Sequence, residues 1–536
     1  MSLDPVMFST ATNMFHSIAN EMGSVMLLSA YSSIAREAKD TSTCLLDAGG
    51  RVVAQSIMIP MHMNSLSSAV GYLRERFELA ATEPDEVYVM NHPYANGQHL
   101  HDIIMMLPIF HAGHLCGFAG SISHHVDVGG SAVISSTATE LFQEGIIIPP
   151  MKLKENAAFH GGVLEQILGA NVRAPGLVLG DYRAQHFACL RGRELLQKMV
   201  ERFGADTVAQ AMTELQDYSE RYMRTNLARL PQGTYHGEDF CDPLRSGEPP
   251  LAIRATVTVS GDQVDVDLSG CADQVEGPVN SPIASTFSAV FTFFVSMMSE
   301  GVPVNDGSYR PITVRTRKGS ICDPIYPAPV RSRMSTCYRI FSALRAAFAT
   351  DVPDRVAACG HETTTSVAFS RRTPEQYHVY HEVIAGGLGA SMHGAGCDGV
   401  AQPLSNTGNT PIEVMELDLD FVRVRSYGLI TGSGGKGKHH GGMGIRKVYE
   451  IVSDDVTFCS NGDRCNTAPW GACGGEPGSR SAFRIQRGDE ILDLGALNTL
   501  RVQKGDLIII ETCGGGGWGK PEPTSSISAE NKKRIA

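Results

Sequence analysis

The stretch "DIIMMLPIFHAGHLCGFAGSISHH" (residues 102–125) predicts two β-strands joined by a turn at Ala112 and Gly113. Both arms are mostly apolar, and the short Ala-Gly connection between them is typical of a hairpin. An antiparallel hairpin places the start of its first strand beside the end of its second strand. Histidines and an aspartate lie at both of these ends. The sequence therefore predicts that these polar side chains share one site.

The predicted site contains residue types that bind divalent metal ions. His99 and Asp102 lie before and at the start of the first strand, and His124 or His125 could meet them from the end of the second strand. Two imidazoles and one carboxylate form a common open ligand set that leaves room for water or substrate. Asp40, in "EAKDTS" after the first predicted helix, is a candidate fourth ligand. The alternative is that these are ordinary polar residues, because the chain has 18 histidines and spacing alone is a weak signal.

Other histidines and acids near this motif fit the metal site less well. Asp127 is a candidate ligand, or an acceptor for the ring N–H of a ligand. His101 lies between Leu100 and Asp102, and we expect it to face elsewhere. His439 and His440 lie in a glycine-rich loop without a paired carboxylate, so we expect solvent or backbone contacts there.

Composition limits the classes of function. The 536-residue chain has a net charge of -12, which argues against nucleic-acid binding. The sequence shows no signal peptide and no uninterrupted apolar stretch of about 18 residues. Its 13 cysteines are scattered without a CxxC pair, which is typical of reduced thiols in a cytoplasm. We therefore expect a cytoplasmic globular protein.

Helix and strand patterns predict a multidomain α+β fold. Residues 6–38 have apolar positions at helical spacing, and residues 191–230 predict two helices broken near Gly204. We expect a domain boundary near residue 232. Residues 1–232 would form an N-terminal mixed α/β domain that carries the hairpin metal site. Residues 233–536 would form a C-terminal α+β region with glycine-rich turns.

Two glycine-rich motifs do not predict a nucleotide site. "GSGGKGKH" (residues 432–439) approaches the phosphate-binding pattern G-x-x-x-x-G-K-[ST], but His439 replaces the hydroxyl residue that would reach magnesium. The residues that follow predict glycine turns and a strand instead of a helix. "CGGGGWG" (residues 513–519) predicts a tight turn, with a backbone nest near a ligand as the alternative.

The chain resembles a known family, the B (β) subunits of ATP-dependent hydantoinases and 5-oxoprolinases, which includes a subunit of acetone and acetophenone carboxylases. The resemblance covers nearly the whole chain. It rests on the following motifs: "LLDAGGRVVAQS", "NHPYANGQHLHD", "SHHVDVGG", "QEGIIIPPMKL", "PVNDGSYRPI", "LSNTGNTPIEVMELD", "GSGGKGKHHGGMG" and "CGGGGWG".

The resemblance implies zinc, or alternatively manganese, at His99, Asp102 and His124, with Asp40 at the acidic position after the first helix. It also implies a separate A (α) subunit that binds ATP and Mg²⁺, in a heterotetramer. The implied activity is ATP-dependent opening of a cyclic amide such as caprolactam, 5-oxoproline or hydantoin to an amino acid, with bicarbonate as a further reactant to consider. Caprolactamase is one candidate type within the family.

The sequence departs from the family pattern beside the expected metal residues. His92 replaces the usual aspartate and Gln98 the usual threonine, which could change the choice of substrate. The first alternative function is a subunit of an ATP-dependent ketone carboxylase. The second is a structural scaffold whose histidines have no chemical role. The roles of His92, His125 and Asp127 stay open at this stage.

Overall fold

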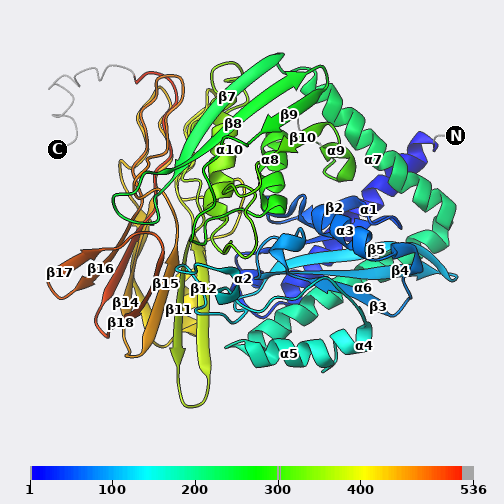
Figure 1. The fold of residues 1–536 in the computed structure, drawn as a ribbon, viewed down its shortest axis with the longest axis horizontal. Helices are drawn as coiled ribbons and strands as arrows, with labels where there is room; N and C mark the ends of the chain where they lie inside the picture. The colour runs from blue at the N-terminus through cyan, green and yellow to red at the C-terminus, as the bar shows by residue number, and fades with distance from the viewer. Residues whose placement is uncertain (1–2, 299–300, 302, 522–536) are drawn as a thin grey trace, which may run out of the picture.

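Four β-sheets and the helices packed on them form the fold in the computed structural model, which describes residues 3–298, 301 and 303–521 (Figure 1). The predicted α+β architecture of several parts is confirmed. None of the helices in these residues is long and apolar enough to cross a membrane.

The first sheet contains the predicted hairpin. Its six strands are all antiparallel and lie in the order β2-β1-β5-β4-β3-β6. The strands are β1 (Thr41–Leu46), β2 (Val52–Ile57), β3 (Glu86–Met90), β4 (Asp102–His111), β5 (His114–His124) and β6 (Met151–Lys154). The turn between β4 and β5 is at Ala112 and Gly113, as predicted, and both residues have positive φ. Asp102 pairs with His124 across the ladder, so the two ends of the hairpin do meet.

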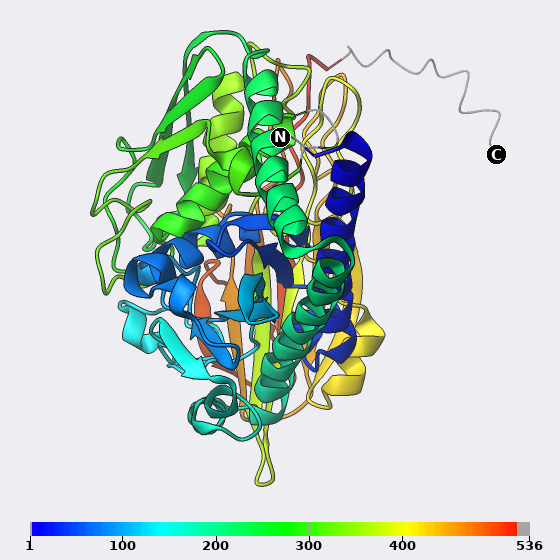
Figure 2. The same ribbon diagram turned by 90° about the vertical axis from the view of Figure 1, so that its right-hand side faces the viewer.

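Helices cover both faces of this sheet, which explains why its strands are apolar without alternation. Ile103 and Met105 point into the core beneath α1 (Pro5–Ser29) and α6 (Pro175–Phe203). Ile104, between them in β4, points to the opposite core beneath α3 (Ser65–Arg76). Figure 2 shows α1, α6 and α7 (Ala205–Leu227) running over the first of these faces.

The first predicted helix is too long. It ends at Ser29, and the short helix α2 (Ser33–Arg36) follows. The carboxylate of Asp181 accepts hydrogen bonds from the backbone N–H groups of Tyr31 and Ser32, so the chain between the two helices is held in an extended conformation. Helical periodicity does not reveal such a tertiary contact.

The second sheet begins just after the predicted boundary, since α7 ends at Leu227 and β7 starts at Gly233. Its order is β10-β9-β8-β7. The strands are β7 (Gly233–Cys241), β8 (Leu251–Ser260), β9 (Gln263–Asp267) and β10 (Ile312–Arg315). Helices α8 (Ile283–Met297) and α10 (Met334–Phe348) pack on it around one core. That core also includes Ile59 and Met61 from the N-terminal part, and the boundary near residue 232 stays a prediction.

The other two sheets form a sandwich. One has the order β12-β11-β15-β18, and its strands are β11 (Thr365–Arg372), β12 (Tyr377–Ile384), β15 (Val456–Asn461) and β18 (Asn498–Val502). The other has the order β13-β14-β19-β16-β17, and its strands are β13 (Val422–Leu429), β14 (Ile445–Ile451), β16 (Ala482–Arg487), β17 (Glu490–Asp493) and β19 (Leu507–Glu511). Phe369 and Phe458 of one sheet share a core with Tyr449 and Ile510 of the other. The remaining short helices are α4 (Glu155–Ala158), α5 (Val163–Asn171), α9 (Asp306–Tyr309) and α11 (Ile412–Asp418).

The glycine-rich segments pack backbone against backbone beside the sandwich. The N–H of Gly435 donates to the carbonyl of Gly515 at 2.8 Å, and the N–H of Gly515 donates to the carbonyl of Gly442 at 2.9 Å. A Cβ atom on Gly515 would lie 2.0 Å from the carbonyl oxygen of Leu388. The tight turn predicted for residues 513–519 is therefore wrong for Gly514–Gly517, which run between other segments without turn structure. The prediction for the residues after 432–439 is confirmed, since the next element is strand β14 and not a helix.

Candidate metal centre

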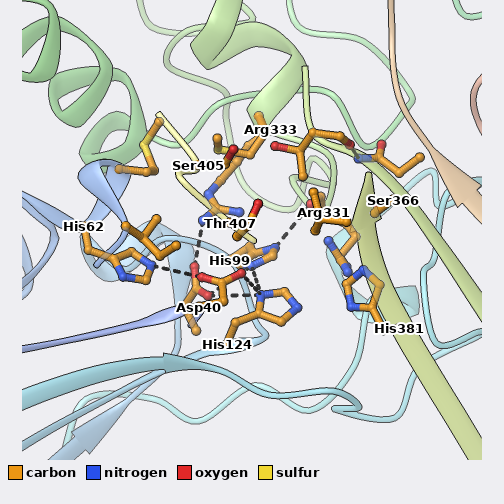
Figure 3. A pocket seen from close by; sticks show the side chains of 17 residues that line it. Asp40, His62, His99, His124, Arg331, Arg333, Ser366, His381, Ser405 and Thr407 are labelled. Atoms are coloured by element: carbon orange, nitrogen blue, oxygen red, sulfur yellow. Dashed lines mark hydrogen bonds and ion pairs between the residues drawn. The ribbon is translucent and has the colours of Figure 1, made fainter. Parts of the chain in front are cut away.

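Three predicted ligands come together at the open end of the β4–β5 hairpin, opposite its turn at Ala112 and Gly113. Asp102 is the first residue of β4, and His124 is the last residue of β5. His99 lies one turn earlier, where its carbonyl accepts the N–H of Asp102 at 2.9 Å. The Nε2 atom of His99 lies 3.1 Å from Asp102 Oδ1 and 3.1 Å from His124 Nδ1, and the latter atom lies 3.3 Å from Asp102 Oδ1 (Figure 3).

The spacing of these three atoms fits one divalent ion. Ligands at about 2.0–2.1 Å from a tetrahedral zinc ion lie about 3.3 Å from one another. His99, Asp102 and His124 are buried, and they form the metal-type cluster found in the part of the chain that the structure describes. Asp102 Oδ1 accepts no hydrogen bond among the described residues, although His99 Nε2 and His124 Nδ1 lie close to it. A cation among the three atoms would stabilise this buried carboxylate oxygen.

The surroundings of His99 set which ring nitrogen faces the cluster. Its Nδ1 atom lies 3.2 Å from the carbonyl oxygen of Arg331, so Nδ1–H is the donor and Nε2 carries the free lone pair. Glu144 holds that carbonyl in place, because its Oε1 accepts the backbone N–H groups of Val330 and Arg331 at 2.8 and 2.7 Å. A hydrogen-bonded support of this kind is typical of metal-binding histidines.

The electrostatic environment favours the metal-binding protonation states. Burial lowers the pKa of His99 well below its ordinary value, and Arg333 lowers it further. Burial also lowers the pKa of His124 to about 4. Burial alone would raise the pKa of Asp102, but His99, while it is protonated, and Arg333 outweigh it and hold this pKa well below the ordinary value. Near pH 7 both imidazoles are neutral, and the charged Arg333 keeps Asp102 ionised.

Asp40 lies beside the three residues and contacts two histidines. Its Oδ2 is 3.8 Å from His124 Nδ1, and its Oδ1 is 3.9 Å from His62 Nε2. The backbone carbonyl of Asp40 also accepts the N–H of His124 at 2.9 Å. Burial, followed by the charge of Asp102, raises the pKa of Asp40 to about 7. A carboxyl group with this pKa can both accept and release a proton near neutral pH.

The other candidate residues from the sequence contribute no atom to the cluster. His125 contacts the side-chain oxygen of Gln185 at 3.0 Å. Asp127 pairs with Arg173 at 2.7 Å and is not part of the cluster. The His101 ring stacks behind that of His124, with 5.0 Å between the centroids, and does not line the cavity.

The two departures from the family pattern also have definite positions. His92 accepts the backbone N–H of Tyr94 and packs beside Tyr326. Gln98 is buried, and its side-chain oxygen accepts a hydrogen bond from Arg333 Nε at 3.2 Å. Arg333 in turn pairs with Asp102, so Gln98 is linked to the cluster through Arg333. His92 has no such link among the described residues.

The structure adds four charged or ring side chains that the sequence did not single out. Arg333 donates to Asp102 Oδ2 at 2.7 Å, and Arg331, His62 and His381 line the same cavity. Arg331 and Arg333 lie in the loop before α10, and His381 lies in β12. The motif "RSR" at residues 331–333 was the only sequence signal for the two arginines, and nothing in it points to a hairpin more than 200 residues earlier.

The cluster opens into a cavity of about 50 Å³. The cavity lies between the first sheet, the start of α10 and the strands of the sandwich. Its apolar wall is made of Ile59, Met61, Met334 and Val383. Its polar wall contains the cluster, the arginines and side chains from the sandwich strands. The arrangement can therefore hold an ion, a small polar group and an apolar group side by side.

Known proteins match the chain over nearly its whole length. A family model described as Hydantoinase B/oxoprolinase matches residues 4–521. The B subunit of a putative D-/L-hydantoinase from Pseudomonas sp. (strain NS671) is 32% identical, over 98% of this chain and 92% of its own length. The crystal structure of ATP-dependent caprolactamase from Pseudomonas jessenii has a TM-score of 0.90 and 26% identity, and covers 99% of this chain and 94% of that chain.

Nucleotide-free acetone carboxylase has the same fold, with a TM-score of 0.89 at 19% identity, over 97% of this chain and 76% of its own. The family match covers far more than half of the sequence and agrees with the shared fold. This chain belongs to the Hydantoinase B/oxoprolinase family.

Proposed function

We propose that the chain is the metal-binding subunit of an ATP-dependent enzyme that hydrolyses cyclic amides, and that ATP and Mg²⁺ are bound by a separate A (α) subunit. The observation that carries the proposal is the buried cluster of His99, Asp102 and His124 in a chain of this family. One relative is named as the B subunit of a hydantoinase and another as an ATP-dependent caprolactamase, which supports the partner and the substrate class. A heterotetramer is the assembly we propose.

The ion would be zinc, or alternatively manganese, since both accept imidazole and carboxylate ligands. When bound, it supplies Lewis-acid polarisation of an oxygen or lowers the pKa of water. His99, Asp102 and His124 would hold it, and Arg333 keeps the Asp102 carboxylate ionised and oriented through a 2.7 Å hydrogen bond. Asp40 either completes the ligand set or takes a proton from the attacking water, for which its pKa of about 7 is suited.

The chemistry of the cavity walls matches the two parts of an amide carried on an aliphatic ring. The polar wall receives the amide group, and Ile59, Met61 and Met334 provide apolar surface for ring methylenes. Opening an unstrained lactam needs coupling to ATP, because the amide is a poor electrophile. The glycine motif at 432–439 is packed among other backbone segments and is followed by a strand, which supports ATP binding by the partner instead of this chain.

The test is a product assay with the chain, its partner, ATP and ¹³C-bicarbonate. Caprolactam, 5-oxoproline, hydantoin and simple ketones are supplied in turn, and products are identified by mass. We expect a ring-opened amino acid without label. A labelled keto acid would instead establish a ketone carboxylase and contradict the proposal.

A matched pair of variants links this activity to the cluster. His124→Ala should reduce turnover by about a hundredfold or more, because it removes a ligand. His114→Ala is the control, since His114 is exposed at the other end of the same strand and should leave turnover unchanged. Full turnover in His124→Ala would favour a scaffold role for this chain.

A further inference from the structure

Arg331 is a buried cation without a protein partner for most of its guanidinium group. Its side chain is 5% exposed, and its Nε and Nη2 atoms have no hydrogen-bond acceptor among the described residues. Other buried arginines differ: Arg333 pairs with Asp102 at 2.7 Å, and Arg464 pairs with Asp239 at 2.6 Å. A buried guanidinium left without partners is strongly destabilising, so proteins seldom keep one unless a ligand binds it.

Further unpaired polar atoms line the same cavity. His381 is buried and neither of its ring nitrogens has a partner in the described structure. The same holds for the hydroxyl oxygens of Thr364 and Thr407 and for Oδ1 of Asn461. Native proteins leave few such atoms, and these four residues line one cavity together with Arg331. Their convergence indicates a polar ligand.

The charge around the cavity favours an anion. Two carboxylates line it with Arg331: Asp102, which pairs with Arg333, and Asp40, whose pKa is raised to about 7. Neither of them accepts a hydrogen bond from Nε or Nη2 of Arg331. Both ring nitrogens of His381 lack a partner among the described residues, and an imidazole always carries at least one N–H to donate. A divalent ion at the neighbouring cluster would add further positive charge.

The size and position of the cavity limit the anion to a small one. A volume of about 50 Å³ holds about three to five water-sized groups, which suits a carbonate or a phosphoryl group. The ring centroid of His381 lies 5.6 Å from that of His124. Figure 3 shows the side chain of Arg331 next to His381, on the side of the cavity away from His62.

We infer that Arg331 and His381 form a subsite for a small oxyanion, directly beside the cluster of His99, Asp102 and His124. Arg331 donates two hydrogen bonds from Nε and Nη2 to one oxyanion, the geometry in which guanidinium binds carboxylates and phosphates. The binding itself needs only this chain. The natural source of the oxyanion rests on the proposed function: either bicarbonate or a phosphoryl group made with ATP.

The test measures anion binding by the zinc-loaded complex of chain and partner, without ATP. Sodium bicarbonate and inorganic phosphate are titrated separately by calorimetry at constant ionic strength. We expect saturable binding of at least one of them, and the tighter one identifies the source. Arg331→Met should weaken it about tenfold or more, and Arg331→Lys should weaken it less, because lysine keeps the charge but not the fork.

Two controls separate a subsite from a structural role. Zinc content and melting temperature must match those of the wild type, and Arg372→Met, at an exposed position in the neighbouring strand β11, should bind as the wild type does. If Arg331→Met does not fold, the anion affinities of Arg331→Lys and His381→Asn are compared with that of the wild type instead. Failure of the wild type to bind either anion, or equal binding by the folded Arg331 and His381 variants, would overturn the inference. Intact anion binding without lactam turnover would instead disprove the proposed function and leave the subsite standing.

Discussion

Glu144 connects the loop that carries Arg331 to the ring of His99. Its Oε1 accepts two backbone N–H groups, and its Oε2 is buried without a hydrogen-bond partner in the described structure. Burial raises the pKa of Glu144 to about 8, although the two backbone hydrogen bonds oppose the rise. This side chain is therefore neutral at pH 7 and orients a metal-binding residue through the Arg331 carbonyl.

The titration of Glu144 predicts a pH-dependent stability difference. The folded state keeps the proton up to about pH 8, whereas the unfolded chain releases it near 4.5, so the contribution of this group to stability falls as pH rises between these values. Glu144→Gln cannot ionise and keeps the accepting oxygen. Its free energy of unfolding should match that of the wild type near pH 5 and exceed it at pH 9, on the order of 3 kcal/mol.

Denaturant unfolding at both pH values measures this difference. Glu140→Gln, at an exposed position four residues earlier, is the matched control and should show no pH-dependent gain. An equal offset for Glu144→Gln at pH 5 and pH 9 would mean that the buried carboxyl group is ionised throughout.

Sequence alone could identify the cluster but not the cavity around it. His99 and His124 are 25 residues apart, and one hairpin joins them, so local patterning and hairpin geometry suffice. The carbonyl that orients His99 belongs to Arg331, 232 residues further on. His381 comes from a different sheet again. No periodicity links such distant segments, because their meeting depends on how whole layers pack.

At the scale of elements, the glycine-rich segments show where prediction from local pattern fails. A run such as "GGGG" predicts a turn when only its own conformation is considered. In the structure, the constraint comes from neighbouring backbones: a Cβ atom on Gly441 would lie 1.9 Å from the carbonyl oxygen of Gly515. These glycines are needed for close packing, and they hold the segments next to β14 and β19 of the sandwich.

Alanine substitutions test this packing. Gly515→Ala should lower the free energy of unfolding by about 3 kcal/mol or more, because its Cβ atom would overlap backbone atoms that cannot move aside. Gly428→Ala is the control, since nothing lies within 4 Å of the Cβ position there. Denaturant unfolding gives both values. A Gly515→Ala chain as stable as Gly428→Ala would show that the segments are not tightly packed.

At the scale of the whole molecule, the cavity lies where the first sheet, the loop before α10 and the sandwich meet. The first sheet and the segments that lead into β1 and β4 supply Asp40 and the cluster. The loop before α10 supplies Arg331 and Arg333, and β12 of the sandwich supplies His381. A boundary near residue 232 would divide the chain within this site. The fold class follows from strand and helix patterns, but the junction that forms the site follows only from the packing of distant parts.

The account depends most on the proposal that His99, Asp102 and His124 bind a divalent ion. The most direct measurement is the metal content of the purified chain after incubation with zinc or manganese and dialysis, determined by mass spectrometry of the elements. We predict about one ion per chain in the wild type and in His114→Ala, and loss of that ion in His99→Ala and His124→Ala. A wild-type chain that retains no ion, or a folded His124→Ala chain that retains it in full, would contradict the account.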